Sequence, residues 1–185
     1  MSRKWLVLCV ALLVCSSASA QSLVQVIVDQ SLYNSLTSEI SQYISDLESE
    51  GYATNLSVDT WSSPEDIRAL LQAELANGLV GAVLIGQVPL AQFNLPENLH
   101  ESYRHDFHTS MFYMDLDGEW GGLDQGVYTT HTGQTDAEIW VGLIRAESLT
   151  ATGTETAILK DYFNRVHDYR NGNLYEPPAR AFRLY

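Results

Sequence analysis

The chain has 185 residues and a formal net charge of −13, and its two cysteines, Cys9 and Cys15, both lie within the first 20 residues. A negative field of this size repels nucleic acid and anionic membranes, which argues against both as partners. Because no cysteine follows residue 20, disulfides, a thiol nucleophile and thiolate metal ligands are excluded from the rest of the chain. The length indicates one domain.

The N-terminus has the features of an export signal. Arg3 and Lys4 precede an apolar run over residues 5–14, and small residues with an Ala-x-Ala pattern end at Ala20. This order predicts a secretory signal peptide over residues 1–20 and a secreted, periplasmic or extracellular location. The apolar run is too short for a membrane-spanning helix, so we expect no membrane span.

Short apolar runs alternate with helical patterns through the next 65 residues. Strands are expected at 23–28, 52–58 and 79–86, with one helix from Leu32 to Gly51 and another from Pro64 to Gly78. Ser63 precedes the second helix as an N-cap, and Pro64 suits its first position. The run 79–86 lacks polar alternation, so we expect helices on both of its faces and a mostly parallel sheet with right-handed crossovers.

The regular pattern breaks from about residue 87 to 136, where an irregular acidic insertion contains one predicted strand at 111–114. A strand over 138–144 and a helix from Ile158 to Tyr169, closing at Asn171-Gly172, restore the alternation. Residues 179–185 resemble the start of another strand. We therefore expect a three-layer α/β/α sandwich that is incomplete at its C-terminus, the leading part of a larger unit.

Within the insertion, carboxylates alternate around a glycine in a manner typical of a calcium loop. The expected ligands are Asp115, Asp117, Glu119 and Asp124, with Asp136 and Glu138 close enough in sequence to contribute. The spacing matches only part of an EF-hand, because Gly118 stands at the fourth position and no glutamate occupies the twelfth. A solvated acidic turn is the open alternative.

Other chemistry is less well supported by the residue pattern. His100, His105 and His108 lie near acidic residues, which makes a zinc site conceivable, but a surface histidine cluster is the simpler interpretation. His131 and His167 have no evident partner in the sequence. The crowded carboxylates of the acidic loop favour a shared cation over the divided roles of a glycosidase. Phe112, Tyr113 and Trp140 are expected in the core, as alternate residues of strands.

Four segments together resemble the N-terminal subdomain of gingipain-like cysteine peptidases, family C25. They are 81–89 (GAVLIGQVP), 113–120 (YMDLDGEW), 137–142 (AEIWVG) and 162–165 (YFNR). The resemblance implies a caspase-like fold and a calcium site in the acidic loop. It transfers no catalytic residue, because the catalytic histidine and cysteine of that family belong to the following subdomain. The chain departs from the pattern at Leu143, where similar sequences carry arginine.

The expected function is therefore that of a secreted, non-catalytic N-terminal portion of a gingipain-like peptidase with a structural calcium ion. Its expected partners are a downstream catalytic subdomain or a peptide or protein substrate. The alternative is a free-standing extracellular module that binds its partner in a calcium-dependent way.

Overall fold

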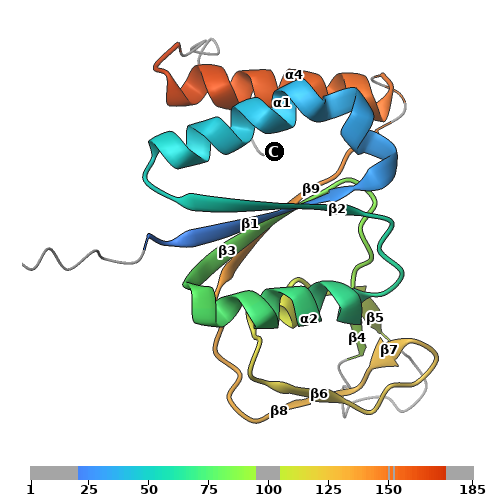
Figure 1. Cartoon of the computed structure of the whole chain (residues 1–185). Coiled ribbons are helices and arrows are strands. Elements are labelled where there is room, and N and C mark those ends of the chain that lie inside the picture. Colours follow the sequence, from blue (N-terminus) through green and yellow to red (C-terminus); the bar gives the residue numbers. More distant parts are fainter. Residues whose placement is uncertain (1–20, 95–104, 150, 152, 174–185) are drawn as a thin grey trace, which may run out of the picture.

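The structure is a computed structural model that describes residues 21–94, 105–149, 151 and 153–173 (Figure 1). The predicted signal peptide at 1–20, the predicted strand at 179–185 and His100 lie outside the described residues. Of the helices in the described ranges, none has both the length and the apolar character that a membrane span requires.

The centre of the molecule is a four-stranded sheet in which every pairing is parallel. Its strand order is β2-β1-β3-β9. The strands are β1 (Leu23–Asp29), β2 (Ala53–Asp59), β3 (Leu79–Ile85) and β9 (Trp140–Ile144). The α/β class and the parallel sheet are as predicted.

Helices cover both faces of this sheet, which is compatible with a three-layer sandwich. Helices α1 (Gln30–Ser49) and α4 (Glu155–Arg170) lie together on one face, and α2 (Pro64–Glu74) lies on the other (Figure 1). Successive β3 residues alternate between two buried clusters: Val83 packs beneath α1 and α4, whereas Leu84 packs beneath α2. A strand buried on both faces needs apolar residues at every position, which is the pattern that the sequence has.

The ends of α2 follow the predicted signals. The Ser63 side chain accepts a hydrogen bond from the Asp66 N–H, and the Asp66 side chain accepts one from the Ser63 N–H, which completes a capping box. A short 3-10 turn, η1 (Leu75–Asn77), follows the helix, and Gly78 ends it with φ of 85°.

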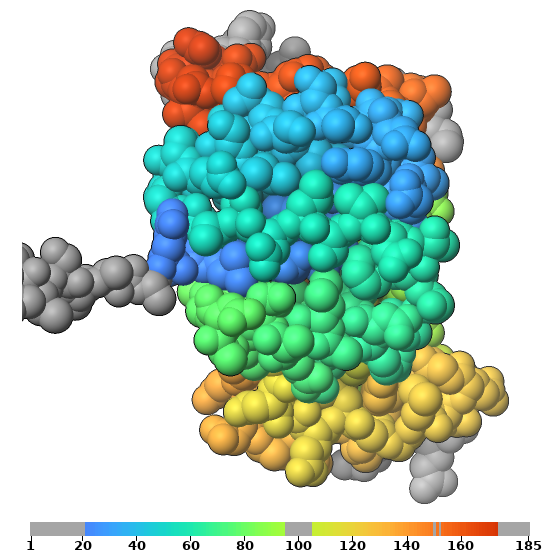
Figure 2. Space-filling view, viewed as in Figure 1, coloured from blue at the N-terminus to red at the C-terminus, as the bar shows by residue number. Residues whose placement is uncertain are grey.

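The acidic insertion contains more regular structure than the sequence indicates. Strands β4 (Gln92–Asn94), β5 (Asp106–His108) and β7 (Val127–Tyr128) form a small sheet, and β6 (Glu119–Gly121) pairs with β8 (Thr130–Thr132). These elements lie beyond α2, at the lower end of the view in Figures 1 and 2.

The strand predicted at 111–114 is wrong, because these residues form the single-turn helix α3 (Met111–Met114). The Met114 N–H donates to the Ser110 carbonyl, which closes the turn. Phe112 and Tyr113 are adjacent, yet both are buried in the cluster beneath α2. A strand would direct adjacent side chains to opposite faces, so their shared burial favours the helical turn.

The core position predicted for Trp140 is also wrong, since its side chain is 41% exposed. Trp140 begins the edge strand β9, and its ring lies across Gly81 of β3, where an added Cβ would come within 2.0 Å of the ring. One face of the indole therefore packs on a neighbouring backbone while the other remains accessible.

Candidate functional site

The acidic loop between α3 and β6 is attached to α2 by an arginine. The Arg68 guanidinium donates hydrogen bonds to three carbonyls of the loop, those of Phe112 at 3.1 Å, Asp115 at 3.0 Å and Gly118 at 2.9 Å. It also lies over the Phe112 ring, 5.3 Å from the centroid. Gln72, one turn further along α2, donates to the Leu116 carbonyl at 2.7 Å. The backbone of the loop is thus positioned by side chains that lie more than 40 residues earlier in the sequence.

Asp115 is the fully buried acid of the site, with 0% exposure. Its Oδ1 accepts the Gly118 N–H at 2.6 Å, and its Oδ2 lies 2.5 Å from His131 Nε2. Buried carboxylates require such partners, because burial removes the water around the ionised group and hydrogen bonds must replace it. An added Cβ on Gly118 would lie 2.3 Å from Oδ2, so only glycine fits this close turn.

His131 reaches Asp115 from the β6–β8 pair. The register of this pair places Trp120 opposite His131, and the two rings stack with centroids 3.9 Å apart at 17°. The indole therefore covers one face of the imidazole and orients its edge toward the aspartate. The sequence showed no partner for His131, because the pairing of β6 with β8 brings it there.

Glu138 enters the loop from the other side, just before β9. Its Oε2 accepts the N–H groups of Leu116 at 2.5 Å and Asp117 at 3.3 Å. Its own N–H donates to the Met114 carbonyl at 3.0 Å, and the Ile139 N–H donates to the same oxygen at 3.2 Å. This anchoring to Met114 explains why β9 begins two residues later than the predicted strand.

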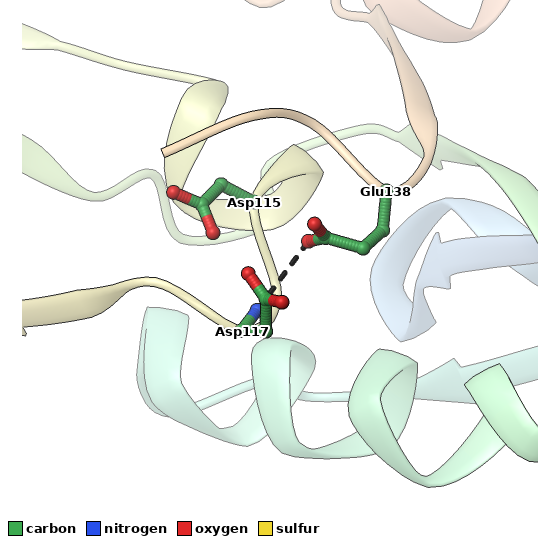
Figure 3. Close-up of side chains that lie close together, drawn as sticks. All are labelled: Asp115, Asp117 and Glu138. Atoms are coloured by element: carbon green, nitrogen blue, oxygen red, sulfur yellow. Dashed lines mark hydrogen bonds between the residues drawn. The ribbon is translucent and has the colours of Figure 1, made fainter. Parts of the chain in front are cut away.

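Three carboxylates consequently converge, those of Asp115, Asp117 and Glu138, and one oxygen from each lies within 4.8 Å of the other two. Figure 3 shows Asp115 at the end of α3 and the carboxyl groups of Asp117 and Glu138 directed toward one another. Asp115 is buried, while Asp117 and Glu138 are exposed. Within the described ranges, this is the one group of three or more acidic, histidine or cysteine side chains with metal-ligand spacing.

The surroundings of Asp117 disfavour its ionised form. Partial desolvation, together with the neighbouring carboxylates of Glu138 and Asp115, raises the pKa of Asp117. For Arg68, burial lowers the pKa of the guanidinium, and the charge of Asp115 opposes that shift. Because Arg68 donates to carbonyls and not to the carboxylates, the three acids keep their capacity to bind a cation.

The structure brings together two of the four ligands predicted from the sequence, Asp115 and Asp117. Glu119 and Asp124 do not belong to the converging group. Glu119 lies in β6 opposite Thr132, and Asp124 lies in a turn that is closed by reciprocal backbone hydrogen bonds with Val127. Both residues lie away from the cluster, because the chain continues from the loop into strand β6. Glu138, predicted only as a residue close enough to contribute, is the third acid.

The other candidates from the sequence do not converge. His105 and His108 are exposed, and neither belongs to a metal-ligand group in the described part of the chain. His167 pairs through Nδ1 with Asp46 of α1 at 2.9 Å, so it links two helices.

The donor set fits a hard divalent cation. Each ionised carboxylate offers about four lone-pair positions, so Glu138 and Asp115 retain acceptor capacity beyond the hydrogen bonds they make. Oxygen ligands at such spacing suit calcium, which takes six to eight of them from carboxylates, carbonyls and water. The triad lies at the amino end of β9, whereas ligands of open parallel sheets usually bind at the carboxyl ends of the strands.

In comparisons with family models, curated proteins and solved structures, none matches the chain.

Proposed function

We propose that Asp115, Asp117 and Glu138 bind a structural calcium ion in an exported α/β protein of the gingipain-like type. The observation that carries the proposal is the convergence of three carboxylates on a loop whose backbone Arg68 and Gln72 hold in place. Desolvation and then the charges of Glu138 and Asp115 raise the pKa of Asp117, and a bound cation would offset the repulsion between these carboxylates. The ion would tie the insertion to the start of β9.

The larger assignment rests on the sequence resemblance. We propose that the chain corresponds to the caspase-like, non-catalytic N-terminal portion of a family C25 peptidase. The parallel sheet with helices on both faces is compatible with this class and supports the proposal. Its role would be to support a catalytic subdomain, in which a thiolate attacks the peptide carbonyl and a histidine transfers the proton.

A second candidate is a calcium-dependent extracellular binding module. Phe107 and Leu123, 47% and 59% exposed, lie on the same insertion as Asp115 and Asp117 and would provide apolar contacts for a partner. Reading the coding sequence beyond residue 185 separates the two functions. A downstream strand ending in His-Gly and another ending in cysteine would favour the peptidase, whereas a stop codon with a stable product would favour the module.

The calcium site is tested by thermal melting with millimolar calcium and with chelator. Ligand that binds only the folded state stabilises it by about 2.7 kcal/mol at 100 times the dissociation constant, so the melting temperature should rise with calcium. Magnesium should act more weakly, because it requires near-octahedral geometry. Equal melting temperatures in calcium and in chelator would remove the metal proposal.

Single variants assign the ligands. Asp117→Asn and Glu138→Gln should abolish most of the calcium-dependent rise, whereas Glu119→Gln and Asp124→Asn should retain it. The pKa of Asp117 is raised in the folded chain, so the fold favours the protonated carboxyl group. This stabilising contribution is lost as pH rises through the folded-state pKa, and the ionised carboxylate present at neutral pH destabilises the fold. Asp117→Asn should therefore melt higher than the unmodified chain in chelator at neutral pH. Retention of the rise in both triad variants would contradict the assignment.

A further inference from the structure

His131 bonds to the buried acid of the triad and limits how that acid can turn. Asp115 is 0% exposed, and its two oxygens have different partners: Oδ1 accepts the Gly118 N–H at 2.6 Å, and Oδ2 lies 2.5 Å from His131 Nε2. Because an ionised carboxylate only accepts hydrogen bonds, the His131 nitrogen is the donor in this contact. One donor on each oxygen restricts the rotation of the carboxyl group about its Cβ–Cγ bond.

The imidazole is itself held in place by Trp120. The register of β6 and β8 sets the two residues opposite each other, and their rings stack 3.9 Å apart at 17°. Trp120 in turn meets the rings of Phe93, Phe112 and Tyr128 edge-on, at centroid distances of 5.7, 5.3 and 6.0 Å. The side chain of His131 is only 16% exposed. An imidazole packed in this way has few orientations, so the packing of the insertion determines where its N–H points.

His131 does not belong to the group of converging ligands. One oxygen from each of Asp115, Asp117 and Glu138 lies within 4.8 Å of the other two, and His131 is not a member of this group. Calcium prefers oxygen ligands, whereas imidazole suits zinc and other transition metals. The geometry therefore favours an effect of His131 on the ion that acts through Asp115.

Asp115 depends on such a bond more than the other two acids do. Asp117 and Glu138 are exposed, so water solvates their carboxylates. The Asp115 carboxylate is shielded from water, and a buried carboxylate without donors costs free energy. His131 supplies one of these donors and still leaves about one lone pair on each Asp115 oxygen for a cation.

We propose that His131 is a positioning residue of the calcium site, which orients Asp115 for the ion without contacting the ion itself. The inference rests on the proposed calcium site. Hydrogen-bond partners behind the ligands of a metal site typically contribute about 10- to 100-fold to metal affinity. Loss of the His131 donor should weaken calcium binding by a factor in this range, because Asp115 would then have to be ordered when the ion binds.

Two substitutions of His131 separate its donor from its ring. His131→Phe keeps an aromatic ring for the stack on Trp120 but has no donor, whereas His131→Gln keeps an amide N–H near the position of Nε2. Isothermal titration calorimetry of the full chain, after treatment with chelator, measures the calcium affinity. We expect the dissociation constant to rise about 10- to 100-fold in His131→Phe and less than about threefold in His131→Gln. His108→Phe, at an exposed histidine outside the triad, is the matched control and should bind calcium unchanged.

Urea denaturation in chelator distinguishes positioning from a purely structural role. If His131 only stabilises the fold, His131→Phe will lower the free energy of unfolding while the folded variant binds calcium with unchanged affinity, and this result would overturn the inference. Equal weakening of calcium binding in His131→Phe and His131→Gln would also overturn it, because the donor would not be the cause. Absence of calcium binding in the unmodified chain would instead overturn the calcium site, and this inference with it.

The imidazole resonances of the unmodified chain give a second measurement, which does not require His131→Phe to fold. The nitrogen-15 chemical shifts of the His131 ring should change on saturation with calcium, because its bonded partner Asp115 becomes a ligand. His167 is the internal control: its Nδ1 bonds to Asp46 of α1, so its shifts should stay the same. Unchanged His131 shifts at saturating calcium would contradict the proposal.

Discussion

Gly118 and the Asp115 carboxylate form the closest turn of the acidic loop. An added Cβ at Gly118 would lie 2.3 Å from Asp115 Oδ2 and 2.7 Å from its Cγ. Because Asp115 is fully buried and bonded to His131, it has little room to withdraw. We expect Gly118→Ala to lower the free energy of unfolding by about 1–3 kcal/mol, measured by urea denaturation.

Gly142 supplies the matched control for this substitution. It lies in β9, and an added Cβ there meets nothing within 4 Å. Gly142→Ala should leave stability within about 0.5 kcal/mol of the unmodified chain or raise it slightly. Equal losses for the two alanine variants would mean that the crowding at Asp115 is not the cause.

The buried Tyr113 phenol should affect how the free energy of unfolding falls at alkaline pH. Its hydroxyl donates to the Pro89 carbonyl at 2.5 Å, and burial, followed by the charge of Glu65, raises the pKa of the phenol. The neutral phenol is therefore favoured in the folded chain. Its contribution is present below about pH 10, where the unfolded phenol ionises, and is lost as pH rises toward the folded-state pKa.

Tyr113→Phe should accordingly flatten the loss of unfolding free energy between about pH 9 and 11, in urea titrations across that range. At pH 7 the same variant should be less stable by about 1 kcal/mol, because it loses a buried hydrogen bond. Tyr169→Phe, at a side chain that is 68% exposed, is the control and should preserve the alkaline slope. An unchanged slope in Tyr113→Phe would assign alkaline unfolding to other groups.

At the scale of elements, α2 and the acidic loop behave as one unit through Arg68. The guanidinium serves three carbonyls at once, and a lysine ammonium cannot reproduce that planar geometry. Arg68→Lys should lower the free energy of unfolding by about 2 kcal/mol and weaken the proposed calcium binding, both measured by denaturation with and without calcium.

Arg165→Lys is the control for the change of cation. Arg165 is on the exposed face of α4 and pairs with Asp161 one turn earlier. Such surface pairs contribute only about 0.3–0.5 kcal/mol, so this variant should be close to neutral. A neutral result for Arg68→Lys as well would indicate that the loop keeps its shape without this anchor.

At the scale of the whole molecule, α4 closes the upper layer by packing on α1. Phe163 is 3% exposed and meets the Tyr43 ring edge-on at a centroid distance of 5.4 Å. The pair His167–Asp46 joins the same two helices, and Arg170 of α4 pairs with Glu50, the C-cap residue of α1. Apolar burial supplies most of this attachment, because partly exposed ion pairs contribute little.

Phe163→Ala should therefore lower the free energy of unfolding by about 3 kcal/mol or more. Tyr169→Ala, on the exposed side of the same helix, should cost less than about 1 kcal/mol. Circular dichroism during urea unfolding measures both. A small effect of Phe163→Ala would mean that the ion pairs hold α4 in place.

Local rules were sufficient for the central elements of the fold. The unbroken apolar run of β3 predicted burial on both faces, and the structure places clusters on either side of it. Ser63, Pro64 and Gly78 marked the ends of α2 and η1, because caps depend on side chains within a few residues. These features are determined over distances that a sequence window covers.

The tertiary structure decided what local rules could not. Residues 111–114 became a helical turn because both aromatic side chains are buried against α2, which no local pattern encodes. Spacing along the chain identified Asp115 and Asp117, but strand β6 carried Glu119 away from the group. Glu138, His131 and Arg68 come from elements 16 to 47 residues distant from Asp115. Because their convergence depends on strand register and helix packing, the sequence by itself determined which functional side chains are available. The tertiary structure determined which of them come together.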